Sequence, residues 1–532
     1  MIHYTRILPA VLLLSSAWAQ TRPAEGVVLS NDAWPRSTLL AEWTSDVMRI
    51  SGVEKASETA QGKAFFTWLR LFSRMAVGGM IQAFEGPYGK EAYVLDANKQ
   101  LFVYGWGYCD TTSRIAEAAW QEYKRDPRAA ERVITQHDGG GYHTMYRLRM
   151  DGRHGAFDPR YGYYLIERDA PGARILDWSE LNGKFEINRS YKHRVGPFFE
   201  IGGIECQRAL LLRPAYFESE TAWRAAGAPK ENVFGNGAYK MGTPLHDMTF
   251  ALQRGMTIER FWDNSARKFY VPAGAQSKRE WPFLPTGRFY RVTETSHGGS
   301  WVKDDPNYQR VKQYLSTVPA NEGYPAEVAG GRTIGQAYGV IHYTPQLDGA
   351  AEQIFDMRSP FVLVDGTLSA KLSGAGAEIA IRTLAPKPRN AAEPDQWSQW
   401  QTLAASDGAK LAELGRPRFN GRDVSIHGTY RFQIRARVPK GAGLTALSMK
   451  LYFENGIMSI PPLFAGRNAL RFRLHDASAL TAPVTVVYRY ETAAGEKTHR
   501  QVLSPADFHQ GEAAYVAEAP GLIRCRSVSI SY

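Results

Sequence analysis

The stretch Leu101-Phe102-Val103-Tyr104-Gly105-Trp106-Gly107-Tyr108-Cys109-Asp110-Thr111-Thr112-Ser113 is the most informative part of the sequence. Two glycines precede the cysteine, and apolar residues at helical spacing follow it from Ile115 to Tyr123. The Asp-Thr-Thr run directly after the cysteine consists of residue types that cap helix N-termini. The sequence therefore predicts a cysteine at a glycine-rich turn that opens a helix, which ends near Asp126-Pro127.

Such a setting suits a nucleophilic thiol. The N-terminus of a helix carries a partial positive charge and N–H groups without intrahelical acceptors, and both lower the pKa of a thiol. A neighbouring imidazolium lowers it further, and the same N–H groups can stabilise an oxyanion. A cysteine can equally be a small buried hydrophobic residue. The interpretation of Cys109 thus depends on which other groups lie near it.

A hairpin follows the cysteine in the sequence. The segment Tyr142–Met150 alternates like a strand, Asp151-Gly152 is a strong signal for a two-residue turn, and Arg153–Phe157 returns as the partner strand. With that turn, Met150 pairs with Arg153.

The same count places Met145 opposite Asp158. His143 lies two residues before Met145 and belongs to the same row of the hairpin. His143 and Asp158 are then diagonal neighbours, and the carboxylate can orient the imidazole toward a thiolate. Without Cys109 in reach, each of these residues would more simply be structural.

Taken together, these elements resemble the transglutaminase-like superfamily. Gly107-Tyr108-Cys109 corresponds to the family's Gly-x-Cys turn, Tyr142-His143 to its histidine strand, and Phe157-Asp158-Pro159 to the Asp-Pro that ends the next strand. The resemblance covers roughly residues 60 to 170 and implies a papain-like triad of Cys109, His143 and Asp158. Two features depart from the family pattern: Thr144-Met145-Tyr146 follows the histidine where a tryptophan is common, and Asp110 follows the cysteine in place of an aromatic residue.

The expected fold class is α+β, with a transglutaminase-like (papain-like) core followed by β-sandwich modules. We expect a signal peptide over residues 1–19, the catalytic core over 36–175, a β-rich middle region over 176–345 and a C-terminal β-sandwich domain over 346–532. Short alternating strands separated by turns dominate the second half of the sequence.

The 532 residues carry a formal charge of +11, with an isoelectric point near 9.3. A basic n-region, a short apolar run and Ala17-Trp18-Ala19 indicate cleavage near Ala19 and a secreted or periplasmic protein that is not an integral membrane protein. Cys109, Cys206 and Cys525 are too few for a disulfide scaffold, although Cys206 and Cys525 could pair. The charge favours acidic surfaces, and no nucleic-acid motif is present.

Two functions fit the sequence. The first is a thiol enzyme in which Cys109 attacks a carboxamide with His143 as base, acting as an amidase, a peptidase or a transglutaminase on a peptide, protein or cell-wall substrate. The second is a polysaccharide lyase or hydrolase for an acidic glycan, with His143 as base and Tyr142 or Tyr146 as acid. Tyr104, Trp106 and Tyr142 are candidate substrate-binding residues, with core packing as the alternative, and neither a cofactor nor a metal is expected.

Overall fold

The computed structural model describes residues 23–72, 74–75, 85–86, 89–90, 96–107, 109–137, 141–159, 163–168, 170, 172–181, 194–195, 218–225, 246–262, 264–266, 269–270, 335–336, 338–384, 396–405, 408–415, 425–456 and 459–532. Strands hold 49% of these residues and helices 20%. The expectation of an α+β chain built on a papain-like core is therefore wrong, because the protein is mainly β with large antiparallel sheets. The longer helices, α1 (Leu40–Ile50), α2 (Glu58–Phe72) and α3 (Cys109–Lys124), all lie in the first 130 residues. Farther along the chain, segments in which buried and exposed residues alternate form long strands.

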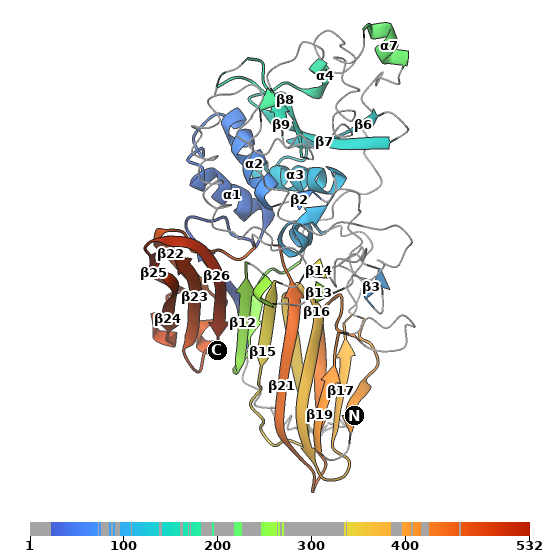
Figure 1. Ribbon diagram of the computed structural model, residues 1–532, viewed down its shortest axis with the longest axis vertical. Helices are drawn as coiled ribbons and strands as arrows, with labels where there is room; N and C mark the ends of the chain where they lie inside the picture. The colour runs from blue at the N-terminus through green and yellow to red at the C-terminus, as the bar shows by residue number, and fades with distance from the viewer. Residues whose placement is uncertain are drawn as a thin grey trace, which may run out of the picture.

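The helices gather at one end of the molecule (Figure 1). Helices α1 and α3 form where apolar residues recur at helical spacing. In α1 the side chains of Leu40, Trp43 and Val47 are fully buried. The helices are α1 (Leu40–Ile50), α2 (Glu58–Phe72), the π-helix η1 (Lys99–Tyr104), α3 (Cys109–Lys124), α4 (Trp178–Leu181) and α7 (Glu220–Ala225).

A five-stranded antiparallel sheet packs against α2 and α3 (Figure 1). Phe66 on α2 contacts the Phe157 and Tyr164 rings of this sheet, with ring centroids 5.4 and 5.6 Å away. The strand order is β10-β9-β8-β7-β6, with β6 (Ala130–His137), β7 (Gly141–Met150), β8 (Arg153–Asp158), β9 (Tyr163–Leu165) and β10 (Arg194–Val195).

An eleven-stranded sheet forms most of the rest of the protein. Its order is β18-β17-β20-β16-β21-β15-β12-β26-β23-β24, and β19 pairs with β16 off this path. The sheet crosses the expected domain boundary at residue 345, since β15 lies before it and pairs with β21 after it. The strands are β12 (Met256–Phe261), β15 (Gly339–Tyr343), β16 (Glu352–Ser373), β17 (Glu378–Thr383), β18 (Gln401–Ala405), β19 (Gly408–Glu413), β20 (Thr429–Arg437), β21 (Gly443–Glu454), β23 (Val484–Thr492), β24 (Gly495–Leu503) and β26 (Leu522–Ser531).

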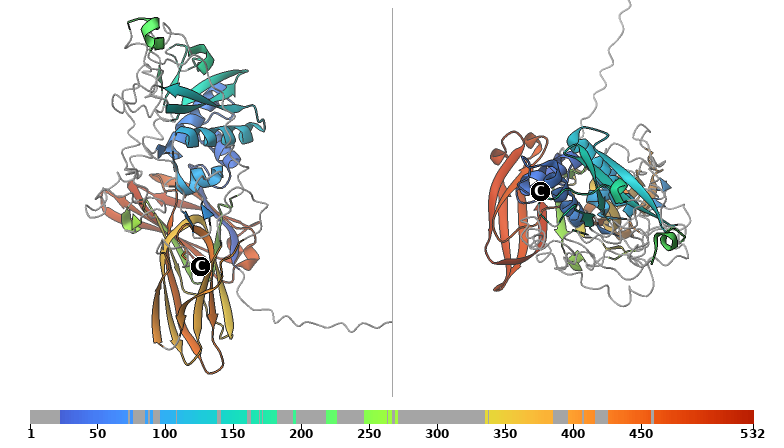
Figure 2. Two further views of the ribbon diagram at one scale, coloured as in Figure 1. Left: turned by 90° about the vertical axis from the view of Figure 1, so that its right-hand side faces the viewer. Right: turned by 90° about the horizontal axis from the view of Figure 1, so that it is seen from above.

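A four-stranded sheet has the order β11-β1-β22-β25 and includes the first described strand of the chain. Its strands are β1 (Ala24–Asn31), β11 (Phe250–Leu252), β22 (Gly466–Arg473) and β25 (Glu512–Ala519). Strand β1 thus lies beside a strand from the C-terminal part of the chain, as Figure 2 also shows from two further sides. Three two-stranded sheets complete the strands: β2 (Arg74–Met75) with β5 (Trp106–Gly107), β3 (Glu85–Gly86) with β4 (Gly89–Lys90), and β13 (Phe269–Tyr270) with β14 (Gly335–Gln336).

Aromatic packing joins the helical end to the sheets. Trp34, which is 1% exposed, lies 5.2 Å from the rings of both Trp68 and Phe72 on α2 and 6.0 Å from the ring of Phe464 before β22. A second junction lies just before Cys109: the Gly456 N–H donates to the Phe102 carbonyl oxygen at 2.8 Å. The segment that leads to the cysteine is therefore fixed on the large sheet.

Candidate functional site

Cys109 is the first residue of α3, as the sequence predicts, and its side chain is 8% exposed. The preceding turn contains Gly105, whose positive φ of 65° ends the π-helix η1. A side chain at this position would also press on Gly456, 3.1 Å from the place of a Cβ atom. Glycine is thus required by both conformation and contact, and it orients the chain for the start of α3.

Helix α3 runs alongside β7 in the same direction. The Ser113 hydroxyl donates to the Thr144 carbonyl oxygen at 3.3 Å. One turn later Glu117 accepts from Arg132, whose strand partner on β7 is Tyr146. After another turn Gln121 donates to the carbonyl oxygen of Ala130, whose strand partner on β7 is Leu148. Four helical residues advance about 6 Å and two strand residues about 6.6 Å, so the two elements stay level.

The same step taken backwards from Ser113 and Thr144 puts Cys109 level with Tyr142, the neighbour of His143. His143 lies in β7, where it is paired with Thr135 of β6, and its side chain lies outside the described residues. The structure thus brings the cysteine of α3 beside the part of β7 that contains the histidine.

The start of α3 lies at an edge of β7 that no described residue of β8 pairs with. In the described part of the chain the pairs between β7 and β8 end at Tyr146–Phe157, while β7 continues to Gly141 along β6. The N–H of Arg149 donates to Ala129 on the β6 side at 2.7 Å, so alternation turns the Thr144 carbonyl toward the β8 side. The Ser113 hydroxyl therefore meets β7 at the part of this edge that no described residue of β8 pairs with.

The hairpin has the register that the sequence predicts. Met150 pairs with Arg153 and Tyr146 with Phe157, and Asp151 and Gly152 form the turn with φ angles of 50° and 78°. Met145 and Asp158 are the next residues beyond Tyr146–Phe157, but the pairing of the two strands stops before them.

Met145 and Tyr146 lie on opposite faces of the sheet. Met145 packs with Val133 and Ala156 in a small cluster, whereas Tyr146 and Leu148 lie in the main core with α3. Met145 therefore faces away from the body of α3.

Asp158 is fully buried at the end of β8. Burial raises the pKa of Tyr146 well above its ordinary value, the Arg70 guanidinium lowers it, and the Asp158 carboxylate raises it further. The charges of Arg70 and Asp158 therefore both act on the Tyr146 hydroxyl. Tyr146, a candidate acid in the glycan interpretation, is 0% exposed and cannot reach a substrate from solution.

Asp110, beside the cysteine, is engaged by two arginines. Its carboxylate accepts from Arg114 at 2.7 Å and from Arg132 at 3.2 Å, and Arg132 is also bound to Glu117 at 2.9 Å. These contacts oppose the field of Asp110 at the start of α3. Arg114 follows Asp110 by four residues on α3, whereas Arg132 comes from β6 and is not identifiable from the sequence motif.

The candidate substrate-binding residues are dispersed. Tyr104 is 3% exposed, and its hydroxyl lies 3.0 Å from that of Tyr430 on β20, which is a packing contact between η1 and the large sheet. Trp106 lies in β5 and Tyr142 in β7, paired with Gln136, and neither side chain is among those described.

The remaining cysteines differ from Cys109. Cys525 on β26 is a reduced thiol that is 1% exposed, and burial raises its pKa to about 12. Cys206 and the expected signal segment lie outside the described residues.

Two absences hold for the part of the chain that the structure describes. No group of three or more His, Cys, Asp or Glu side chains there could hold a metal ion. Within the same residues no helix combines the length and the apolar character needed to cross a bilayer.

The fold and the site define a mainly β protein in which a helix-covered sheet holds a thiol at a helix N-terminus. No protein-family model matches the sequence, and no curated protein is similar to it. A crystal structure of a beta-galactosidase candidate from Bacteroides fragilis matches 34% of this chain at 11% identity with a TM-score of 0.09. The match spans 27% of that protein's own length, and a likeness this weak carries no argument.

Proposed function

We propose that the protein is an exported thiol-dependent acyl-transfer enzyme in which Cys109 attacks a carboxamide with His143 as base, as in transglutaminase-like proteins. The observation that carries the proposal is the Ser113–Thr144 contact, because it sets the start of α3 against the part of β7 that contains His143. The proposal does not depend on a papain-like fold, which the mainly β structure excludes. Cys-His arrangements of this kind recur on unrelated folds.

In the proposed reaction, the thiolate of Cys109 adds to the carboxamide carbon to form a C–S bond. The tetrahedral intermediate collapses as the C–N bond breaks, and the imidazolium of His143 gives its proton to the departing ammonia or amine. Water or a second amine then attacks the thioester and releases the thiol. Hydrolysis would make the protein an amidase or peptidase, and attack by a lysine amine would make it a transglutaminase.

Asp158 is proposed to hold the imidazole of His143 in one tautomer. Its support is its place at the end of β8, directly after the last β7–β8 pair, and its complete burial there, where a carboxylate interacts strongly with its neighbours. The arginines on Asp110 support the reactive thiol, because they offset the negative charge of this neighbouring carboxylate. The substrate class proposed is a peptide, a protein or a cell-wall peptide.

Trapping of the acyl-enzyme with hydroxylamine tests this function. Blocked glutamine peptides are incubated with the mature protein and hydroxylamine, and the hydroxamate formed is measured. We expect Cys109→Ser to lower the rate at least about a hundredfold, since the nucleophile is lost. Cys525→Ser is the matched control and should leave the rate unchanged.

Retained hydroxamate formation in Cys109→Ser would contradict the proposal. Acidic polysaccharides are assayed in parallel, with Cys109→Ala. Their cleavage by this variant at the wild-type rate would instead favour the lyase or hydrolase, in which Cys109 takes no part.

A further inference from the structure

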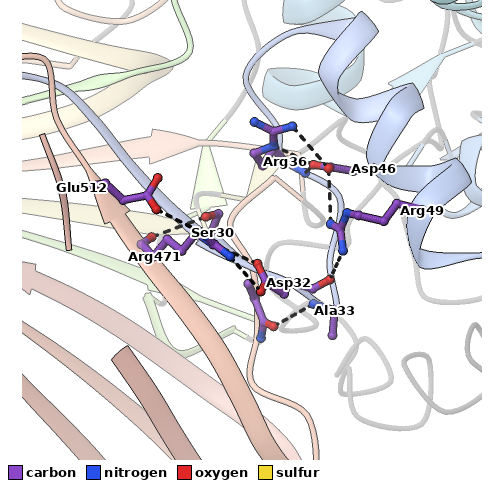
Figure 3. A network of polar contacts seen from close by, with 9 residues as sticks. Ser30, Asp32, Ala33, Arg36, Asp46, Arg49, Arg471 and Glu512 are labelled. Carbon is purple, nitrogen blue, oxygen red and sulfur yellow. Dashed lines mark hydrogen bonds and ion pairs between the residues drawn. The ribbon is translucent and has the colours of Figure 1, made fainter. Parts of the chain in front are cut away.

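A cavity of about 240 Å³ lies between β1, α1 and the β22–β25 pair, away from Cys109. Four arginines line it, and they come from distant parts of the sequence: Arg36 and Arg49 from the helical end, and Arg471 and Arg473 from β22. Figure 3 shows Arg36 and Arg49 on one side and Arg471 on the other. Guanidinium groups gathered around one cavity repel one another and are costly to bury unless negative charges lie close to them.

Three carboxylates line the same cavity, and three of the arginines already bind them. Asp46 accepts from Arg36 at 2.7 Å and from Arg49 at 3.3 Å (Figure 3). Arg471 donates to Asp32 at 3.2 Å and to Glu512 at 3.0 Å. In the lining itself the arginines exceed the carboxylates by one, and Glu42, outside the lining, lies 3.6 Å from Arg36.

Of the four arginines that line the cavity, Arg473 takes no part in these pairs. Within the described residues it forms no ion pair and no side-chain hydrogen bond, although it is only partly exposed. It lies two residues after Arg471 on β22, so both side chains belong to the same face of the strand. The excess charge of the cavity can therefore be assigned to Arg473.

The cavity suits a small and hydrophilic occupant. Pockets for drug-sized ligands are usually larger and mostly apolar, whereas arginine, aspartate and glutamate dominate the lining here. A guanidinium group presents a planar fork of donors that matches the oxygens of a carboxylate or a phosphate.

We propose that this cavity is a binding site for a compact oxyanion, a carboxylate or phosphate group, with Arg473 as its principal charge partner. The bound anion would lie between the loop before α1 and strand β22, and would thus link the helical end to the sheets. The proposal is independent of the acyl-transfer function.

The test is isothermal titration calorimetry of the full mature chain with inorganic phosphate, with glucuronate and with neutral glucose, at fixed ionic strength. We expect saturable binding of at least one anion and none of glucose. Arg473→Gln should weaken the binding about tenfold or more, since a hydrogen bond to a charged group is lost. Arg467→Gln, which removes an exposed charge from the same strand outside the cavity, should change it less than about twofold.

Binding of phosphate alone would assign the site to a phosphate group, and binding of glucuronate alone to a carboxylate. Arg473→Lys keeps the charge but loses the planar fork, so we expect an intermediate affinity. This variant also serves if Arg473→Gln does not fold, which its thermal melting curve will show. Absence of saturable binding to both anions, or equal affinity in wild type and the Arg473 variants, would overturn the proposal.

Discussion

The Ser113 hydroxyl donates to the Thr144 carbonyl oxygen at 3.3 Å, and this contact fixes the start of α3 against β7. Ser113 lies one helical turn after Cys109, and Thr144 directly follows His143 along the strand. The bond therefore holds the first turns of α3 against the part of β7 that contains His143. The same bond lies at the edge of β7 that no described residue of β8 pairs with.

The arginines on Asp110 should tune the reactivity of the thiol. Arg132→Met removes one partner of the Asp110 carboxylate, so we expect the pH midpoint for alkylation of Cys109 to rise by about half a unit or more. Asp110→Asn removes the carboxylate charge and should move the midpoint in the opposite direction. The measurement is the rate of iodoacetamide labelling against pH. Identical midpoints in both variants would show that this ion-pair network does not act on Cys109.

The hairpin turn should also contribute to stability, because Asp151 caps helix α2. Its carboxylate accepts from the Glu58 N–H at 3.1 Å and from the N–H and hydroxyl of Thr59 at 3.0 and 2.7 Å. We expect Asp151→Ala to lower the free energy of unfolding by about 1–2 kcal/mol. Asp151→Asn should cost less, since asparagine keeps an acceptor and tolerates the φ of 50°. Urea denaturation measures both, and equal stability of wild type and Asp151→Ala would refute the cap.

The pH dependence of stability should include a contribution from His246. Burial, followed by the charge of Lys99, lowers the pKa of His246 from 6.5 to about 4, and its Nε2 lies 2.6 Å from the Pro360 carbonyl oxygen. The unfolded chain therefore binds this proton more tightly than the folded protein does. The contribution is complete above about pH 6.5 and is lost as the pH falls through 4, which amounts to about 3 kcal/mol.

Urea denaturation between pH 7 and pH 4 measures this loss. His246→Gln should flatten the curve over that interval, and the exposed His475→Gln serves as the control that should not. An unchanged pH slope in His246→Gln would contradict the assignment.

Tyr146→Phe separates the two functional interpretations. The Tyr146 hydroxyl is buried, and among the described residues it has no hydrogen-bond partner. Its removal should therefore leave the free energy of unfolding within about 1 kcal/mol of wild type and leave alkylation of Cys109 unchanged. Loss of polysaccharide cleavage in this variant would instead assign Tyr146 the role of an acid.

Local patterns in the sequence predict the local elements well. The helix that opens at Cys109 and the pairing of Met150 with Arg153 are both confirmed, because capping residues, helical spacing and an Asp-Gly turn act over a few residues. The expected α+β fold class is wrong, because it extends the character of these local elements to the whole chain, which is mainly β. Pairings such as Val28 with Arg473 join residues more than 400 positions apart, and no local pattern contains them.

The surroundings of the site show the same limit. Arg132 is an ordinary strand residue in the sequence, and only the pairing of β6 with β7 brings it to Asp110. Tyr104 was a candidate for substrate binding because it lies near Cys109 in the sequence, yet its hydroxyl faces Tyr430. The sequence around Cys109 predicts the helix that opens there, but it does not predict which distant residues contact the neighbouring side chains.

The most direct test of the central claim is the alkylation rate of Cys109 against pH in the mature folded protein, read peptide by peptide. Cys525 is an internal reference, because burial raises its pKa to about 12 and should keep its labelling slow. The account predicts fast alkylation of Cys109 that persists well below pH 7 and is lost in His143→Ala. A slow thiol, or one whose pH profile is unchanged by His143→Ala, would contradict a thiolate–imidazolium pair at this site.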